Sequence, residues 1–411
     1  MKIGFLWHCV YPWDIRLEKM IGAVIGEGNT ACVICKSRPD LPRREQHGAL
    51  TIRRVVAPPR LRWINRLATF PLFFNPLWIQ ETRQAMREEE LDILIVRDVP
   101  LAMLAAQAGK RLGKPVVLDM AENYPAALVS YNKLSYKPLL LGDAWLPRRY
   151  ERICLSEVDH VFVVAEEQRL RLFRLGMASP EITLIGNTPV DSFLRSANAY
   201  VQDPSGATPS SLNLLYVGFI DPHRGADIAL RALPELLKDI PTLTLTLVGD
   251  GTARQSLIAL AEQLGIAGSV SFPGWVDFGR VPDYIRHSDV CIIPHLESEH
   301  TNTTLPNKLF DYMAFAKPIV ASDCKPIQRV IEEADCGITF KSGDVADFVR
   351  AVKQLIRDPS RDGRGRSGRM AIERKYNWEI DKKVFLQAIE TIGRGEYDRS
   401  SRAPNPVYHY C

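Results

Sequence analysis

Short apolar runs alternate with amphipathic stretches along most of the chain, and the whole alternation occurs twice. In the first half, the runs predicted as strands are Ile3–Trp7, Thr30–Cys35, Ile93–Val96, Val116–Leu118, His160–Val164 and Ile182–Ile185. In the second half, they are Asn213–Val217, Thr242–Val248, Val270–Phe272, Val290–Ile293, Ile319–Ala321 and Gly337–Phe340. Helices are expected between them, among them Leu101–Leu112, Asp227–Leu237 and Ala253–Leu264. This order is typical of parallel sheets with crossover helices.

The two alternating halves predict two domains. Ser196–Ser211 is rich in Asn, Asp, Pro, Gly, Ser and Thr, and it is interpreted as the linker between them. The predicted order is a domain at 1–195, the linker at 196–211, a domain at 212–375, a closing helix at 376–395 and a loose tail at 396–411. Two doubly wound α/β domains facing a cleft would bind ligands at the carboxyl ends of their strands.

Composition and charge narrow the class of protein. Among the 411 residues, 46% are hydrophobic and 24% charged, as in ordinary globular proteins, and no run of about 18 apolar residues could span a membrane. The chain starts with a strand-like run and no signal peptide, so we expect a cytoplasmic protein. The eight cysteines are scattered and expected to be reduced, and the pair Cys32 and Cys35 has no second pair with which to bind zinc.

One basic and aromatic stretch favours contact with a membrane surface. Acidic residues are absent between Gln46 and Gln80, where Arg53 and Arg54 are followed by further cations and aromatic residues. The residues expected at an anionic lipid surface are Arg60, Arg62, Trp63, Arg66, Phe73, Phe74 and Trp78. A second patch around Trp145 would extend this surface. The alternative is a core helix with an arginine-coated face, and nucleic acid is disfavoured because the net charge is only +4.

The segment Thr304–Ser322 has the pattern of a nucleotide site. Pro306 suits the first turn of a helix over Leu305–Ala316, and Lys308 and Asp311 would share one face of it, about one turn apart. The free N–H groups of a helix start attract phosphate, and a carboxylate can bind a ribose. The alternative is a buried helix with a surface pair of Lys and Asp.

This segment resembles the family 4 retaining glycosyltransferases, in the subset with a Pro-x-Lys-x-x-Glu-Tyr-Met-Ala motif. Asp311 stands where the family has its ribose-binding Glu, and Thr303 stands eight residues earlier, where the family's first acid would be. The resemblance spans roughly Met1–Trp378 and implies the GT-B fold, two Rossmann-like domains facing a cleft. It also implies that the closing helices cross back onto the N-terminal domain.

Other segments of the second half match the family's donor site. The resemblance places Gly218 and Arg224 at the diphosphate, with Phe219 in place of an expected Arg and Arg224 in place of an expected Lys. Gly249 and Gly251 either let the backbone approach a ligand or permit a tight turn, and Trp275 either stacks on the base or fills the sheet edge. The remaining residues assigned to the donor are Thr303, Thr304, Leu305, Lys308 and Asp311.

The first domain is expected to bind the acceptor. Its first turn lacks the Gly-x-Gly-x-x-Gly of dinucleotide binders, and it offers His8 and Arg16 instead. The segment from Asp119 resembles the family's Asp-x-His-Glu, with Ala121 in place of the His. Asp119, Glu122 and Asn123 would orient sugar hydroxyls, and Glu122 would serve as acceptor base if burial raised its pKa. The alternative is that Glu122 caps the following loop.

The resemblance implies transfer of a sugar from a UDP- or GDP-linked donor to an acceptor hydroxyl, with retention of configuration. Arg224 and Lys308 would stabilise the leaving diphosphate, so no metal or other cofactor is expected. With the basic and aromatic surface, this suggests a lipid-linked glycan acceptor at the inner face of the plasma membrane, in cell-surface polysaccharide synthesis. The alternatives are a silent nucleotide-sugar-binding scaffold and an epimerase of nucleotide sugars.

Overall fold

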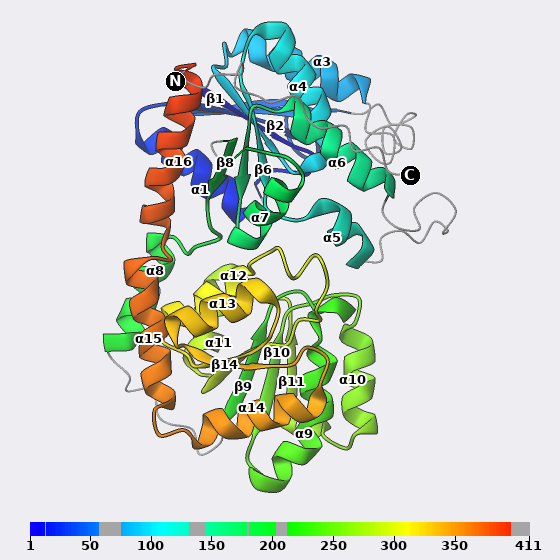
Figure 1. The fold of residues 1–411 in the computed structure, drawn as a ribbon, viewed down its shortest axis with the longest axis vertical. Helices are drawn as coiled ribbons and strands as arrows, with labels where there is room; N and C mark the ends of the chain where they lie inside the picture. The colour runs from blue at the N-terminus through cyan, green and yellow to red at the C-terminus, as the bar shows by residue number, and fades with distance from the viewer. Residues whose placement is uncertain (13, 57–74, 131–144, 179–180, 203–211, 396–411) are drawn as a thin grey trace. The chain divides into compact units, whose positions relative to one another are not determined.

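The computed structural model describes residues 1–12, 14–56, 75–130, 145–178, 181–202 and 212–395. The chain forms two units. One holds most of the residues up to Ile185 together with those from Asp381, and the other holds Gly186–Ile380 together with Ser130 at the end of the segment 75–130. Each unit contains a largely parallel sheet with helices packed on its faces (Figure 1). This confirms the prediction of two doubly wound α/β domains.

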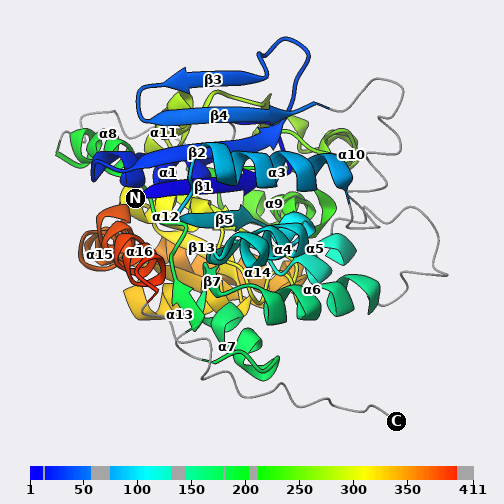
Figure 2. The same ribbon diagram turned by 90° about the horizontal axis from the view of Figure 1, so that it is seen from above.

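The sheet of the first unit has eight strands in the order β3-β4-β2-β1-β5-β6-β7-β8. Figure 2 shows β3, β4, β2, β1 and β5 side by side in this order. Their bounds are β1 Lys2–Trp7, β2 Thr30–Lys36, β3 Arg44–His47, β4 Leu50–Val55, β5 Ile93–Arg97, β6 Val116–Met120, β7 His160–Val163 and β8 Ile182–Leu184. All neighbours pair in parallel except β3 and β4, which form an antiparallel hairpin that the sequence did not predict.

Helices cover both faces of this sheet. They are α1 Ile15–Gly26, α3 Pro76–Glu88, α4 Ala102–Leu112, α5 Tyr124–Ser130, α6 Trp145–Glu157 and α7 Glu166–Arg174. Leu6, Leu94 and Leu118 pack with residues of α3, α4 and α6 in one core. Because side chains alternate along a strand, Phe5 and Ile95 point to the other face, where α1 lies. The near-continuous apolar strands therefore reflect burial on both faces.

The basic and aromatic stretch differs from its predicted role where the structure describes it. Arg53 and Arg54 lie in β4 and are buried, with side chains 7% and 2% exposed. Arg53 pairs with Glu81, Glu88 and Glu89, and Arg54 pairs with Glu45. These carboxylates come from elements that the sequence reading did not place beside β4. The cations are therefore neutralised and do not face a membrane.

Trp78 is also a correction, because its side chain is 3% exposed and packs in the core under α3. An indole at this depth stabilises the unit by removing apolar area from water and cannot contact a lipid surface. The other residues assigned to that surface, Arg60, Arg62, Trp63, Arg66, Phe73 and Phe74, lie outside the described residues.

The sheet of the second unit has six parallel strands in the order β11-β10-β9-β12-β13-β14. Their bounds are β9 Asn213–Val217, β10 Thr244–Val248, β11 Val270–Gly274, β12 Val290–Ile293, β13 Ile319–Ser322 and β14 Gly337–Phe340. In chain order this is 3-2-1-4-5-6, the arrangement of doubly wound nucleotide-binding folds, in which ligands bind where the strand order reverses. Here the reversal lies between β9 and β12.

Helices of the second unit begin before the predicted linker ends. They are α8 Asp191–Gln202, α9 Ala226–Asp239, α10 Arg254–Gln263, α11 Val281–Arg286, α12 Asn307–Ala314, α13 Lys325–Ala334, α14 Val345–Arg357 and α15 Arg361–Arg374. Residues 196–202, predicted as linker, continue α8, so the structure moves the domain boundary back to Ile185 and Gly186. Residues 196–202 were predicted as a loop from their polar composition, because α8 is amphipathic and carries few apolar residues.

The Arg/Gly/Ser run at Arg361–Arg369 forms most of α15. A Cβ atom at Gly365 would lie 1.9 Å from the carbonyl oxygen of Ala316, so only glycine allows this approach to the end of α12. Arg369 donates from Nη1 to the carbonyl oxygen of Ala314 at 2.7 Å. A cation at a helix C-terminus satisfies unpaired carbonyls and the dipole, and it helps to anchor α12.

The last helix, α16 (Trp378–Gly393), leaves the second unit and enters the first. Phe385 packs edge to face on Phe162 of β7 with ring centroids 5.8 Å apart, and Ile389 is buried beside it. Lys19 of α1 lies near Asp381, and burial, with the nearby Arg16, lowers its pKa to about 7. The first unit is thus built from both ends of the described chain.

The described cysteines are reduced and mostly buried, as the sequence predicted. All seven described cysteines are free thiols, and burial raises the pKa of Cys32 to about 12 and that of Cys35 to about 11. Such thiols are poor nucleophiles and poor metal ligands. Among the helices that the structure describes, none is both long and apolar enough to cross a bilayer.

Candidate functional site

Several basic side chains of the second unit gather at the reversal of strand order. Arg224 lies in the short 3-10 helix η4 (Pro222–Arg224) that follows β9, and His295 comes two residues after β12. Lys308 lies in the first turn of α12, whose N-terminus has no side-chain cap. In doubly wound sheets, this edge is where ligands bind. The topology therefore brings together cations that the sequence separates by more than 80 residues.

Lys308 is half-buried as a residue, but its ammonium group lies in an unusual buried environment. Its Nζ is inaccessible to solvent and donates no hydrogen bond to the described residues. Instead, it lies 3.6 Å from the centroid of the Tyr216 ring, a cation–π contact. Burial, and then the neighbouring Arg224, lower its pKa well below the usual value, with partial opposition from Asp311. A buried cation with so little compensation is expected to gain much from an anion.

Arg224 is the second cation of this cluster. Its Nη1 lies 3.5 Å from Nε2 of His295, a long contact in which the guanidinium can only donate. Gly225 makes this placement possible, because it has φ of 66° and a Cβ there would lie 1.9 Å from the carbonyl oxygen of Pro294. Only glycine lets η4 lie so close to the end of β12. Arg224 and Lys308 thus lie close together, as the family resemblance implied.

Three buried histidines surround these cations, and the sequence reading missed them. His223, His295 and His300 are 9%, 2% and 2% exposed, and the rings of His223 and His300 lie 6.4 Å apart. Burial and then Arg224 lower the pKa of His223 to about 4, and they lower that of His295 well below its usual value. One signal was available in the sequence, since His223 adjoins Arg224 and His295 lies two residues after a predicted strand.

The loop before α12 holds the other residues assigned to the donor. The hydroxyl of Thr303 donates to the carbonyl oxygens of Glu299 and His300 at 2.8 and 3.1 Å, and that of Thr304 donates to His300 at 2.9 Å. Thr303 is 7% exposed, so it fixes the loop instead of presenting a polar group as the family's acid would.

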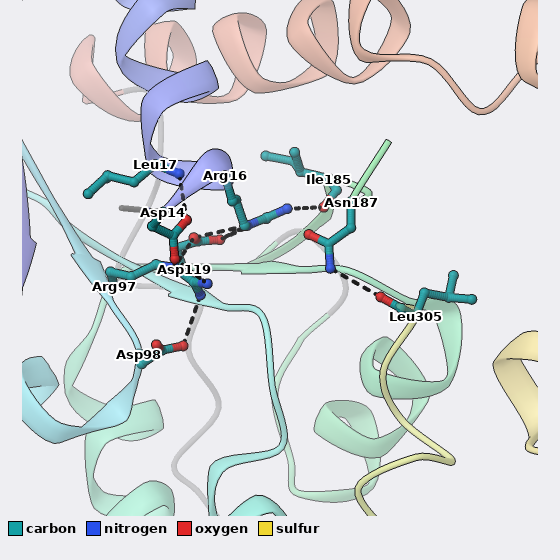
Figure 3. Close-up of polar contacts among 9 residues, drawn as sticks. All are labelled: Asp14, Arg16, Leu17, Arg97, Asp98, Asp119, Ile185, Asn187 and Leu305. Atoms are coloured by element: carbon teal, nitrogen blue, oxygen red, sulfur yellow. Dashed lines mark hydrogen bonds and ion pairs between the residues drawn. The ribbon is translucent and has the colours of Figure 1, made fainter. Parts of the chain in front are cut away.

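Leu305 and Asp311 lie on either side of Lys308 in the chain. The carbonyl oxygen of Leu305 accepts a hydrogen bond of 3.1 Å from Nδ2 of Asn187, which the sequence reading did not identify (Figure 3). Asp311 is half-buried, and its charge raises the pKa of Lys308, as expected if the two share one face of α12. Tyr312, the residue after Asp311, accepts a hydrogen bond from the backbone N–H of Val217 at 2.9 Å and ties α12 to the end of β9.

Gly218, Gly249 and Gly251 meet backbone and side chains at the strand ends. A Cβ at Gly249 would lie 2.0 Å from the carbonyl oxygen of Gly218, and one at Gly251 would lie 2.4 Å from that of Ile220. These two glycines therefore let the turns after β9 and β10 pack against each other. At Gly218, a Cβ would lie 2.8 Å from Nζ of Lys308, so the absence of a side chain here makes room for the ammonium group.

Two exposed aromatic rings lie beside these turns. Trp275 is 68% exposed and Phe219 is 58% exposed, and their ring centroids are 6.0 Å apart at an interplanar angle of 45°. Trp275 therefore does not fill the sheet edge, which was one of its two predicted roles. Phe219, which stands where the family has an Arg, supplies a second flat apolar surface instead of a second cation.

In the first unit, a network of arginines and carboxylates occupies the corresponding reversal of strand order, between β1 and β5 (Figure 3). Arg16 binds both oxygens of Asp119 through Nε at 3.0 Å, and its Nη1 donates to the carbonyl oxygen of Ile185 at 2.8 Å. Their side chains are 5% and 1% exposed. This corrects the prediction that Arg16 binds the acceptor and that Asp119 orients hydroxyls, because each saturates the other.

Arg97, at the end of β5, joins two more carboxylates to this network. It contacts Asp14 at 3.1 Å and Asp98 at 2.9 Å, and Asp14 also caps α1 by accepting from the N–H of Leu17 (Figure 3). Asp98 has φ of 64°, a strained value for a residue other than glycine. Burial raises the pKa of Asp98 to about 7 against the attraction of Arg97. A carboxyl near its titration point in a strained turn is typical of functional sites.

Glu122, Asn123 and His8 complete the residues assigned to the acceptor. Glu122 is half-buried after β6, close enough to Asp98 that its charge helps to raise the pKa of Asp98. Asn123 is fully buried and directly precedes α5, where its side-chain Oδ1 accepts from the N–H of Ala126 at 3.4 Å, so the structure gives it a capping role instead of acceptor contact. His8 is half-buried in the turn after β1.

Among the described residues, no three His, Cys, Asp or Glu side chains come together as a possible metal site. Cys32 and Cys35, considered for zinc, are both buried in β2, and at three residues apart in a strand their side chains point to opposite faces of the sheet.

Comparison with known proteins agrees with this geometry. Residues 16–188 match the model described as "Glycosyl transferase 4-like domain", and residues 211–358 match "Glycosyl transferases group 1". A phosphatidyl-myo-inositol mannosyltransferase of Mycobacterium tuberculosis is 27% identical over 95% of this chain and 97% of its own length. A glycogen synthase of the same species is 26% identical, and that match spans 64% of this chain and only 59% of the synthase.

A solved structure of Anabaena Alr3699/HepE in complex with UDP superposes with a TM-score of 0.72 at 15% identity, covering 95% of this chain and 100% of that one. This likeness shows the shared GT-B fold. Each of the two family models matches one of the two units. The chain therefore belongs to the glycosyltransferases with a 4-like N-terminal domain and a group 1 C-terminal domain.

Proposed function

We propose that this protein moves a sugar from a nucleotide diphosphate sugar, UDP- or GDP-linked, to an acceptor hydroxyl with retention of configuration. The observation that carries this proposal is the buried ammonium group of Lys308, which lies beside Arg224 without a hydrogen-bond acceptor among the described residues. Two cations at a strand-order reversal and an uncapped helix start suit a diphosphate. The solved structure of Alr3699/HepE was obtained with UDP, which supports a nucleotide donor.

The same groups can assist the reaction. When the bond from the anomeric carbon to the diphosphate breaks, negative charge grows on the leaving oxygen, and preorganised cations lower the barrier most where that charge develops. Arg224 can bind two phosphate oxygens with its planar group, while Lys308 supplies a point charge. We propose that these side chains replace the divalent cation used by other transferases, so that activity should persist in EDTA.

The base and ribose of the donor also have candidate partners. Trp275 and Phe219 offer exposed rings beside the turn that ends β11, and a base can stack on such a surface. Asp311 follows Lys308 by about one turn of α12 and is proposed to accept hydrogen bonds from the ribose hydroxyls.

On the acceptor side, the first unit offers Glu122 and Asp98. Both lie at the carboxyl ends of neighbouring strands, β6 and β5, and they interact electrostatically. We propose that one of these carboxyl groups accepts a hydrogen bond from the reacting hydroxyl. Asp98 is the better candidate because its pKa is about 7, so it can bind or release a proton near neutral pH.

A lipid-linked glycan is the proposed acceptor, and its support is the exposed face of α6. Trp145 is 62% exposed with the guanidinium of Arg149 placed 5.7 Å from its ring centroid, and Arg148, Arg152 and Ile153 are exposed on the same helix. Cations and an indole on one surface suit an anionic lipid interface. This face would hold the protein at the inner leaflet of the plasma membrane.

Thermal unfolding tests the donor site. The protein is heated with UDP, GDP, ADP, CMP and NAD, and with UDP-glucose, GDP-mannose and ADP-glucose, at millimolar concentration. Stabilisation by one nucleotide diphosphate supports the proposal and names the base, and it should disappear in Asp311→Ala. Lys238→Ala is the matched control, because Lys238 is an exposed lysine of α9 that pairs with Glu235. A shift with NAD alone, or with none of the ligands, rules the proposal out.

Product analysis and vesicle binding test the remaining parts. Release of nucleotide diphosphate together with a new α- or β-glycoside of unchanged anomeric configuration identifies a retaining transferase. An altered donor sugar without transfer identifies an epimerase, and binding without turnover identifies a scaffold. Vesicles of phosphatidylglycerol should retain the protein in sedimentation, and Trp145→Ala with Arg149→Glu should release it, while Arg231→Glu in α9 should not.

A further inference from the structure

The three buried histidines lie around the two cations of the proposed donor site, and nothing in the proposed chemistry has used them. Nε2 of His295 lies 3.5 Å from Nη1 of Arg224, and the ring of His223 lies 6.4 Å from that of His300. His223 is the residue next to Arg224 in η4, and its carbonyl oxygen accepts a hydrogen bond of 3.0 Å from the N–H of Leu296.

Hydrogen bonds from neighbouring side chains hold the backbones of His295 and His300 in place. The hydroxyls of Thr303 and Thr304 both bind the carbonyl oxygen of His300, and Sγ of Cys324 and Oγ of Ser342 both contact that of His295. Four side chains therefore hold the backbones of two histidines in place. Loops that are fixed so firmly around ionisable side chains are typical of binding sites.

The protonation state of His295 in the free protein follows from its neighbour. A guanidinium has donors and no acceptor, so Nε2 of His295 must carry no proton where it faces Arg224. A protonated ring would place two cations in contact inside the protein. His295 is therefore neutral in the absence of an anion, and its remaining proton is on Nδ1.

Electrostatics gives the same picture for the cluster as a whole. After burial, the groups that lower the pKa of His295 are Arg224, Lys308, His223 and His300. Arg224 and His300 also lower that of His223, and Asp221 acts in the opposite direction. The carboxyl groups on the surrounding elements are Asp221, Glu297, Glu299, Asp311 and Asp323. The charge of Arg224 and the other cations thus disfavours the protonated forms of His223, His295 and Lys308 until an anion arrives.

We propose that His223, His295 and His300 belong to the diphosphate site and that this cluster takes up a proton when the donor binds. The diphosphate carries two negative charges between the nucleoside and the sugar, and it draws the guanidinium of Arg224 toward itself. Nε2 of His295 then becomes free to bind a proton from solvent and to donate it in a hydrogen bond to a phosphate oxygen. This inference rests on the proposed donor site, and it adds a third kind of cation to it.

The consequence is a donor affinity that depends on pH. If one proton is taken up, the dissociation constant should rise by up to about tenfold for each unit of increasing pH in the range where the complex is protonated and the free protein is not. Nucleotide sugars suit this measurement because their diphosphate is esterified at both ends and has no ionisation near neutral pH. Any proton taken up must then bind to the protein.

Isothermal titration calorimetry tests the proposal directly. UDP-glucose, GDP-mannose and ADP-glucose are titrated at pH 7 in HEPES and in Tris, whose enthalpies of ionisation differ. We expect a binding enthalpy that depends on the buffer with the sign of proton uptake. The His295→Gln variant should lose much of this dependence, because a glutamine can still accept a hydrogen bond from Arg224 but cannot be protonated. His287→Gln, which changes an exposed histidine of the same unit, should behave as the wild type.

The outcomes separate this inference from the proposed function. Binding with the same enthalpy in both buffers overturns proton uptake and leaves the donor site standing, whereas no binding of any nucleotide sugar overturns the donor site itself. Proton uptake that persists in His223→Gln, His295→Gln and His300→Gln alike would assign the proton to Lys308 and refute the role of the histidines. Thermal unfolding shows whether His295→Gln folds. If it does not, the buffer dependence of the binding enthalpy in His223→Gln and His300→Gln decides whether the histidines take up the proton.

Discussion

The ammonium nitrogen of Lys308 lies 3.6 Å from the centroid of the Tyr216 ring and has no hydrogen-bond acceptor among the described residues. The ring is itself held in place, because the hydroxyl of Tyr216 donates to the carbonyl oxygen of Phe219 at 2.6 Å. A cation–π contact offsets only part of the cost of removing an ammonium group from water. The free protein therefore carries an electrostatic cost at this position, which an anionic ligand would relieve.

The variant Lys308→Met should separate stability from donor binding. Methionine keeps an unbranched stem against Tyr216 and removes the buried charge, so we expect a melting temperature without ligand equal to or above that of the wild type. Stabilisation by nucleotide diphosphate should be lost. Both effects are read in one thermal unfolding series with and without ligand. A variant that melts lower but is still stabilised by nucleotide would contradict the assignment.

Asp98→Asn should change how stability depends on pH. The pKa of Asp98 is about 7 in the folded protein and near 3.8 in the unfolded chain, so between these values the folded state holds a proton that the unfolded state has lost. Stability from this group is therefore present at low pH and is lost as pH rises toward 7.

Asparagine resembles the protonated acid, so the variant should lack this slope and should be more stable than the wild type at pH 8 relative to pH 5. Urea unfolding at both values measures the difference. An equal change at the two pH values would show that Asp98 does not titrate in this range.

Trp275→Ala should weaken binding of the nucleotide without affecting inorganic pyrophosphate. Stacking of a base on an aromatic ring contributes about 1–3 kcal/mol. The exposed ring of Trp275 has little role in the core, so stability should change little. Calorimetric titration with both ligands gives the comparison, and Phe278→Ala provides an exposed aromatic control from the same unit. Equal weakening of both ligands would place the effect at the diphosphate instead.

Asp119→Asn should destabilise the first unit strongly, since it leaves the buried Arg16 without its counter-ion. Breaking a buried ion pair in this way costs about 3–5 kcal/mol. Asp40→Asn is the matched control, because Asp40 pairs with Arg38 at 2.7 Å on the surface, where solvent screening leaves such pairs little effect on stability. Chemical denaturation of both variants measures the contrast. If the two variants lose similar stability, Asp119 does not have the structural role assigned to it.

Much of the fold was predictable because both sheets are buried on two faces. Strands such as β5 and β12 are continuous apolar runs, and their limits agree with the sequence reading to within a residue. The hairpin of β3 and β4 was missed because its residues are charged. Arg53 and Arg54 suggested a surface, and their burial depends on carboxylates from α3 and β3 that no local pattern places beside them.

The candidate site was predicted in part, because some of its residues are marked by their place in the sequence and others only by their neighbours in space. Lys308 and Arg224 were identifiable because they follow strands and begin helices. His295 and His300 needed the three-dimensional arrangement, since an isolated histidine in a sequence is more often structural. Arg16 and Asp119 were misassigned because each residue type can bind a sugar, and 103 residues separate the two partners that satisfy each other.

The path of α16 has a consequence for the order in which the protein can form during synthesis. All the strands of the second unit lie in one stretch of chain, Gly186–Ile380, so they are available once that stretch has left the ribosome. The first unit starts earlier but lacks Phe385 and Ile389 until α16 has been synthesised, and until then Phe162 lacks the edge-to-face contact with the Phe385 ring. The domain that is synthesised first is therefore the one that is completed last.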